Sequence, residues 1–286
     1  MKNILVLTDF SENAENAARN AVLFGGKLHA NLLLFHNFQG MPVTPIFAGG
    51  GLVSDGLPAW LEEESKERLE ALEKNLDAVK DQLDEDDRVP TIHSQSNEGN
   101  LVENIRFISL KKDIELIVMG SRAKDPLDHF FFGSETYSVI EHADCPVLII
   151  PPGTTLAGLN RIMFATDFEQ ADMAAIKYLI NVGKLFDCDL EIIHVQRPDE
   201  PKTGKSEKEM LFKEELWKLK YPKVTYLKIS GDDVVKRLNN LYKKTGMGLL
   251  AMVHRHRSVF ARILANSTTR EILANQNIPI IVFPSR

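Results

Sequence analysis

The sequence predicts an α/β fold built from two similar domains, each with a five-stranded, doubly wound parallel sheet. Three observations lead to this prediction. The chain has 286 residues, more than one average domain needs. Its apolar segments recur in the same order in the two halves. Within each half, short continuous apolar runs alternate with segments of helical period, and such runs are typical of strands buried on both faces of a parallel sheet.

The repeat consists of four pairs of apolar segments. Asn3–Phe10 recurs as Asn160–Phe168, and both copies end in Thr-Asp-Phe. The remaining pairs match 32–36 with 190–194, 114–119 with 247–252, and 145–151 with 278–284. Four matches in one order are rare by chance, so we infer a duplicated domain. We expect a first domain over 1–151, a linker over 152–159 that starts in a Pro/Gly-rich stretch, and a second domain over 160–286.

Helical segments separate the predicted strands. Residues 101–108 and their counterparts 234–241 each carry one apolar stripe. A long charged segment places leucine or valine every three or four residues from Leu69 to Leu83. This spacing suits a coiled coil or a helix packed on a sheet, and its length of about two heptads favours the sheet. Each half is therefore expected to hold five strands joined by four helices with right-handed crossovers.

Composition and charge exclude several classes of protein. The chain is 44% hydrophobic and 26% charged, which is typical of a globular protein. A net charge of -6 argues against a dedicated nucleic-acid-binding protein, and no apolar run approaches the roughly 20 residues of a membrane span. Cys145 and Cys188 are too few for a disulfide framework or a structural zinc site. We expect a soluble, cytoplasmic protein with no nucleic-acid or membrane partner and no metal site formed by its own side chains.

Two segments compete for a ligand. In doubly wound sheets, ligands bind beyond the carboxyl ends of the strands, where the strand order reverses. Thr8–Ser11 follows the first strand, and the stretch that begins at Gly120 follows the fourth. A helix opens at Gly133-Ser134, so its free N–H groups and positive dipole end would face an anion. Ser134 would either cap this helix or bind phosphate, and the spacing does not decide between the two.

These segments resemble the universal stress protein family, as a tandem of two such domains. The resemblance is carried by Val6–Ser11, Phe35–Asn37, Met119–Thr136 and Cys145–Pro151. The ATP-binding branch of the family has Gly, two residues, Gly, nine residues, then Gly and Ser or Thr. Gly120, Gly133 and Ser134 match this motif, whereas Ala123 stands in place of its middle glycine. The resemblance implies Rossmann-like domains of the adenine-nucleotide alpha-hydrolase type, paired through their last strands as an intrachain pseudo-dimer.

The resemblance also implies a role for each matching residue. Asp9 would hold adenine, with Thr8 and Asn37 lining the same pocket through backbone groups. Met119 and Gly120 would lie beneath the ribose. The phosphates would meet Arg122, Ala123, Gly133, Ser134, Glu135 and Thr136. The implied ligand is ATP or AMP, with or without Mg²⁺, and no catalytic nucleophile is implied.

The second half departs from this motif. Aligned through Pro146 and Pro279, Gly120 becomes Val253, Ala123 becomes His256 and Gly133 becomes Asn266. Matching polar residues remain only at Asp167, Ser267 and Thr269. We therefore expect the second half to bind no nucleotide and to act as a structural or regulatory partner.

Three functions remain open on the sequence. The first is a stress-response regulator that binds ATP or AMP through its first half. The second is an interaction scaffold that binds unidentified protein partners and no nucleotide. The third is an enzyme, which the absence of a Walker loop limits to slow ATP hydrolysis. The sequence also leaves open whether whole chains form homodimers, and whether the Gly/Pro-rich insertion from Gln39 to Pro58 is a lid or an inert loop.

Overall fold

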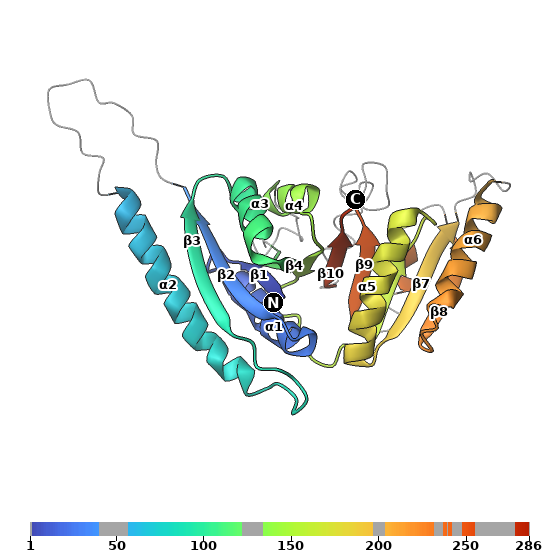
Figure 1. Cartoon of the computed structure of the whole chain (residues 1–286), viewed down its shortest axis with the longest axis horizontal. Helices are drawn as coiled ribbons and strands as arrows, with labels where there is room; N and C mark the ends of the chain where they lie inside the picture. The colour runs from blue at the N-terminus through green and yellow to red at the C-terminus, as the bar shows by residue number, and fades with distance from the viewer. Residues whose placement is uncertain are drawn as a thin grey trace, which may run out of the picture.

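A single ten-stranded sheet runs through the whole molecule in the order β3-β2-β1-β4-β5-β10-β9-β6-β7-β8 (Figure 1). The computed structural model describes residues 2–39, 57–121, 134–196, 204–231, 237–238, 240–241, 248–254 and 278–285. Half one contains β1 (Asn3–Leu7), β2 (Asn31–Phe38), β3 (Ile92–Glu98), β4 (Ile114–Gly120) and β5 (Val147–Ile150). Half two contains β6 (Arg161–Ala165), β7 (Asp189–Gln196), β8 (Val224–Ser230), β9 (Leu249–Val253) and β10 (Ile280–Phe283).

The two halves have the same strand order and meet at their last strands. Neighbouring strands are parallel within each half, whereas β5 and β10 pair antiparallel, with Leu148 opposite Ile281 and Val147 opposite Val282. This arrangement confirms the predicted doubly wound fold and the intrachain pseudo-dimer. Since β5 and β10 pair with each other, their apolar edges are covered.

Helices cover both faces of the sheet. The described helices are α1 (Glu12–Leu28), α2 (Leu57–Lys80), α3 (Leu101–Lys112), α4 (Ser134–His142), α5 (Gln170–Phe186) and α6 (Gly204–Lys218). Side chains of α1, α2, α5 and α6 pack into one core, and side chains of α3 and α4 pack into the core on the other face. Each core contains residues from both halves, so neither core is interrupted where β5 meets β10.

The charged helix α2 packs on the sheet, as its short apolar repeat predicts. Leu69, Leu72, Leu76 and Val79 are all buried in the core that α2 shares with α1. The helix ends at Lys80, so Leu83 lies beyond it. Because α2 begins at Leu57, most of the predicted insertion, residues 40–56, falls outside the described residues.

Two asparagines of α1 hold the segment that connects the halves. Asn20 is only 2% exposed; its Nδ2 donates to Thr154 O at 2.9 Å, and its Oδ1 accepts from the N–H of Leu156 at 2.6 Å. Asn16 Nδ2 donates to Pro151 O and Thr154 O at 3.0 and 3.1 Å. The connection is therefore fixed to the first helix by hydrogen bonds to its backbone.

Candidate functional site

The Thr-Asp-Phe segment forms the same backbone turn in both halves. Phe10 has a left-handed φ of 61°, its N–H donates to Thr8 Oγ1 at 2.9 Å, and its ring lies 4.4 Å from the ring of His36. His36 Nδ1 lies 2.8 Å from Thr8 O, so this nitrogen carries the proton. Half two repeats these contacts. The N–H of Phe168 donates to Thr166 Oγ1 at 3.0 Å, the rings of Phe168 and His194 lie 4.2 Å apart, and His194 Nδ1 lies 2.9 Å from Thr166 O. The paired histidines are therefore a feature of the fold.

The side chain of Asn37 is engaged on the β3 side of β2. Its Nδ2 donates to Gly99 O at 2.8 Å, and its Oδ1 accepts from Asn104 Nδ2 at 2.7 Å. Likewise, Thr8 Oγ1 accepts from the backbone of Phe10. The side chains of Thr8 and Asn37 are therefore already hydrogen-bonded within half one.

The backbone of Asn37 points to the space beyond the end of β1. Alternate residues of a strand direct their N–H and C=O groups to the same neighbouring strand. Phe35 directs its carbonyl to β1, where it accepts from the N–H of Thr8 at 3.0 Å. The β1–β2 register ends at the pair of Leu7 with Phe35, so the backbone groups of Asn37, two residues later, face the same side past that register. A peptide edge of this kind matches the hydrogen-bonding edge of a purine.

Gly120 ends β4 directly against the start of α1. A Cβ atom at this position would lie 2.6 Å from Asn13 O and 3.0 Å from Ala14 N. Its φ lies outside the left-handed region. Glycine is needed here because α1 approaches so closely.

Several predicted site residues meet at the carboxyl edge, where the strand order reverses between β1 and β4. Asp9 is exposed after β1, and its Oδ1 accepts from the N–H of Ser11 at 3.0 Å. Met119 is 8% exposed beside Gly120. At α4, Ser134 and Glu135 are exposed at the first turn and Thr136 is 3% exposed. The other predicted residues, Arg122, Ala123 and Gly133, lie outside the described residues.

Half two has a side chain at the position equivalent to Gly120. Val253 pairs with Phe283 of β10 as Gly120 pairs with Ile150 of β5, so the two positions are equivalent in the structure, as the sequence alignment predicted. Val253 is 5% exposed and belongs to the core beneath α5. The β6–β9 register also ends earlier, at Phe164 with Ala251, whereas the β1–β4 register continues to Leu7 with Met119. A valine therefore occupies the space that α1 occupies in half one.

A buried carboxylate also engages the first loop of half two. Asp172 is 2% exposed, and its Oδ2 accepts from Thr166 Oγ1 at 2.8 Å and from the N–H groups of Asp167 and Glu169 at 3.2 Å each. Half one has Ala14 at this position. Sequence reasoning missed Asp172, although a comparison of the two helix starts would have found it. The other predicted counterparts, His256, Asn266, Ser267 and Thr269, lie outside the described residues.

Comparison with known proteins gives the same duplication. The sequence model of the universal stress protein family matches residues 1–151 and matches again at residues 158–284. The chain belongs to the universal stress protein family. It is 30% identical over 149 residues to a universal stress protein of Thermus aquaticus, covering 52% of this chain and 98% of that protein. It is also 30% identical over 153 residues to a universal stress protein of Methanocaldococcus jannaschii, covering 52% of this chain and 81% of that protein.

Solved universal stress proteins share the two-domain architecture. One from Archaeoglobus fulgidus superposes with a TM-score of 0.71 at 20% identity, covering 99% of this chain and 96% of that chain. A putative universal stress protein from Pseudomonas aeruginosa superposes with a TM-score of 0.58 at 15% identity, covering 99% of this chain and 92% of that chain. These structures agree with the tandem fold. Within the described ranges, no helix is long and apolar enough to cross a membrane, and no three His, Cys, Asp or Glu residues gather as metal ligands.

The second universal stress domain has a buried charge cluster between α6 and β8. Glu209 is 8% exposed and accepts from Lys213 at 2.8 Å, Tyr226 at 2.9 Å and Lys228 at 2.6 Å. Burial alone would raise the pKa of Glu209, but these three hydrogen bonds outweigh it and lower the pKa to about 2. The ring centroid of Tyr226, one of the three donors, lies 6.4 Å from that of Phe168.

Acid is expected to weaken this cluster. Because the pKa of Glu209 falls from 4.5 to about 2 on folding, its contribution is complete above about pH 4.5 and is lost as the pH falls toward 2. We expect Glu209→Gln to lower the free energy of unfolding by about 2 kcal/mol at about pH 6 and by less than half of that near pH 3. Urea denaturation of both proteins at each pH measures this difference. An equal loss at both pH values would contradict the assignment.

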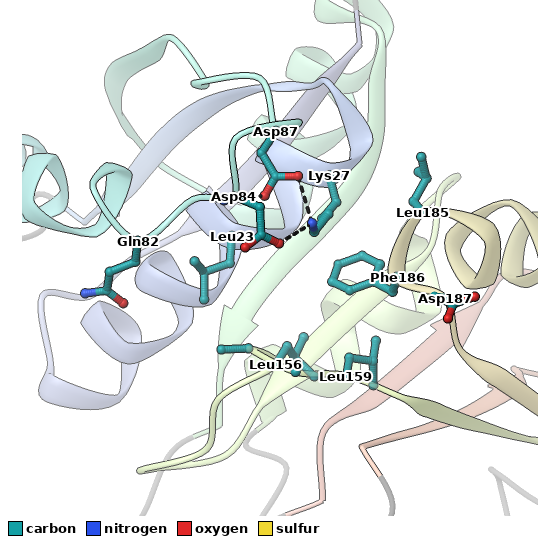
Figure 2. Close-up of a pocket in the computed structure, with 12 residues that line it drawn as sticks. Leu23, Lys27, Gln82, Asp84, Asp87, Leu156, Leu159, Leu185, Phe186 and Asp187 are labelled. Carbon is teal, nitrogen blue, oxygen red and sulfur yellow. Dashed lines mark hydrogen bonds and ion pairs between the residues drawn. The ribbon is translucent and has the colours of Figure 1, made fainter.

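A separate pocket of about 330 Å³ lies between the two universal stress domains (Figure 2). It is formed by the ends of α1 and α5, the turn after α2, and residues 156–159 of the connection. Lys27 Nζ contacts Asp84 at 2.6 Å and Asp87 at 2.9 Å, and these hydrogen bonds raise the pKa of Lys27. Helices α1 and α5 start at the carboxyl edge and end here, so the pocket lies at the opposite edge of the sheet. It contains none of the predicted site residues.

Proposed function

We propose that half one binds ATP or AMP at the carboxyl edge between β1 and β4, and that half two binds no nucleotide. The observation that carries this proposal is the contrast between two equivalent positions. Gly120 lets the start of α1 lie directly against the end of β4 in half one, whereas Val253 places a buried side chain at the equivalent position of half two. Asp172 supports the same conclusion, because it already satisfies the loop amides of half two.

The site in half one offers a different surface to each part of the nucleotide. Adenine would pair with backbone groups of Asn37 and Thr8, beside Asp9. The ribose would lie over Met119 and Gly120. The phosphates would lie at the start of α4, where the helix dipole favours negative charge. The residues proposed for the phosphates are Arg122, Ala123, Gly133, Ser134, Glu135 and Thr136.

Nucleotide binding of this kind suits a regulator of the stress response that acts through protein partners. We place it in the cytoplasm, because Cys145 and Cys188 are both free thiols. The proposed units are residues 1–151 and 160–286, with 152–159 as the connection. We assign no catalytic nucleophile to this site, so any turnover of ATP would be slow hydrolysis.

Calorimetric titration of ATP, AMP and magnesium into the full chain tests the proposal. We expect micromolar binding at one site per chain. Gly120→Val should abolish it, because even the Cβ atom would lie 2.6 Å from Asn13 O. Gly120→Ala adds only that atom and should weaken binding less. The matched control is Val253→Ala in half two, which should leave affinity and stoichiometry unchanged.

The outcomes separate the candidate functions. If folded wild-type protein, checked by circular dichroism, gives no heat with either nucleotide, the proposal fails. The chain would then be a scaffold acting through partner proteins. Loss of binding in the Val253→Ala variant alone would instead place the nucleotide in half two.

A further inference from the structure

An arginine of α2 packs on the turn that carries two of the proposed adenine contacts. The guanidinium carbon of Arg68 lies 4.2 Å from the centre of the Phe10 ring, and the ring of His36 lies 4.4 Å from the same ring. The first of these contacts is a cation–π interaction. Since Phe10 directly follows Thr8 and Asp9 in the chain, the contact joins α2 to the segment that the proposed function assigns to the base.

The backbone of Phe10 depends on support from its surroundings. Its φ of 61° lies in the left-handed region, which is unfavourable for a residue with a large side chain unless neighbouring groups hold it there. The N–H of Phe10 donates to Thr8 Oγ1 at 2.9 Å, and the N–H of Ser11 donates to Asp9 Oδ1 at 3.0 Å. If the ring of Phe10 were released, the turn could relax, and Thr8 and Asp9 would move with it.

The equivalent turn of half two is held by aromatic rings. Phe168 has a φ of 62° and is 6% exposed, and its ring lies 5.4 Å from Phe212 of α6 and 6.4 Å from Tyr226. In half one, Phe10 is half-buried and the side chain of Arg68 is 50% exposed. Half one thus places an exposed cation where half two has rings of its core. An exposed contact is weaker and more easily broken than buried packing, which suits a turn that adjusts to a ligand.

We propose that Arg68 is a positioning residue that sets the nucleotide affinity of half one by holding this turn through Phe10, an inference that rests on the proposed function. The side chain acts on the ring of Phe10 and makes no contact with the nucleotide itself. Because the turn is assigned to the base, adenosine, which has no phosphate, should respond to Arg68 as ATP does.

Calorimetric titration of adenosine and ATP into Arg68 variants of the full chain tests this role. Arg68→Met removes the charge but keeps most of the length of the side chain. We expect it to weaken adenosine binding about fivefold, the equivalent of one cation–π contact of about 1 kcal/mol. Arg68→Lys keeps a cation and should stay within about twofold of wild type. Lys66→Met is the matched control, because it removes the same charge from an exposed position of the same helix. It should leave adenosine affinity unchanged, and ATP binding in Arg68→Met should be about fivefold weaker than in this control.

Phe10→Leu tests whether the effect passes through the ring. In this background Arg68 has no ring to hold, so Arg68→Met should weaken adenosine binding by less than about a further 1.5-fold. A second readout needs no nucleotide. Hydrogen exchange at the amides of Phe10 and Ser11 should be faster in Arg68→Met than in wild type, and Arg68→Lys should restore the slower exchange.

The other outcomes overturn the assignment in distinguishable ways. Unchanged adenosine affinity in Arg68→Met would exclude Arg68 as a positioning residue and leave the proposed function standing. A full fivefold loss in the Phe10→Leu background would show that Arg68 does not act through Phe10. Unchanged exchange rates in Arg68→Met would show that Arg68 does not hold the turn. If wild-type protein binds neither compound, the proposed function fails, and the control of affinity by Arg68 fails with it.

Discussion

Replacing Ile281 with aspartate is expected to separate the two halves of the sheet. Ile281 is fully buried in β10, and its partner across the junction, Leu148, is fully buried as well. A carboxylate at this position would have no cation to pair with among its described apolar neighbours. We expect a loss of about 4–5 kcal/mol in the free energy of unfolding, which chemical denaturation measures.

The same substitution is expected to cause association between chains. Once β10 leaves, β5 becomes an edge strand whose residues are all apolar, and such an edge pairs with other chains. Size-exclusion chromatography with light scattering should show species larger than wild type. Ile281→Val is the matched control, with an expected loss of about 1 kcal/mol and wild-type elution. Wild-type stability in the aspartate variant would mean that the junction does not hold the halves together.

Asn20→Ala is expected to have the second largest effect. The substitution leaves the buried N–H of Leu156 without the oxygen that accepts from it, and it removes one of the two hydrogen bonds that the carbonyl of Thr154 accepts from α1. We expect a loss of about 2–4 kcal/mol, measured by urea denaturation. Limited proteolysis should also cut the connection near Leu156 faster than in wild type, because its backbone is no longer fixed.

Arg19→Ala is the control for Asn20. Arg19 is exposed on the same helix and forms a surface ion pair with Glu15 at 2.8 Å, so its replacement should cost less than about 0.5 kcal/mol. Similar losses in the two variants would show that the connection contributes little to stability. In that case the strand junction alone would join the halves.

Much of the fold could be predicted because the sequences of the two halves can be aligned with each other. The repeated Thr-Asp-Phe identifies equivalent turns, and the prolines before β5 and β10 align Gly120 with Val253. The observed registers confirm that alignment. The buried face of α2 could likewise be predicted from the sequence, because the spacing of its apolar residues marks the side of the helix that packs on the sheet.

The details that distinguish the halves could not be predicted in this way. Asn20 acts on the connection from more than 130 residues away, and no local pattern marks that contact. Gly120 was predicted as a site residue, but the reason for glycine is the proximity of Asn13, which only the structure reveals.

The uninterrupted cores have a consequence for how the chain unfolds. Because each core contains side chains from both halves, neither half can open without exposing apolar surface of the other. We therefore expect one cooperative melting transition instead of two. By linkage, a ligand that binds only the folded form of half one raises the melting temperature of the whole chain. The melting of half two would thus depend on whether the site in half one is occupied, although half two contributes no residue to that site.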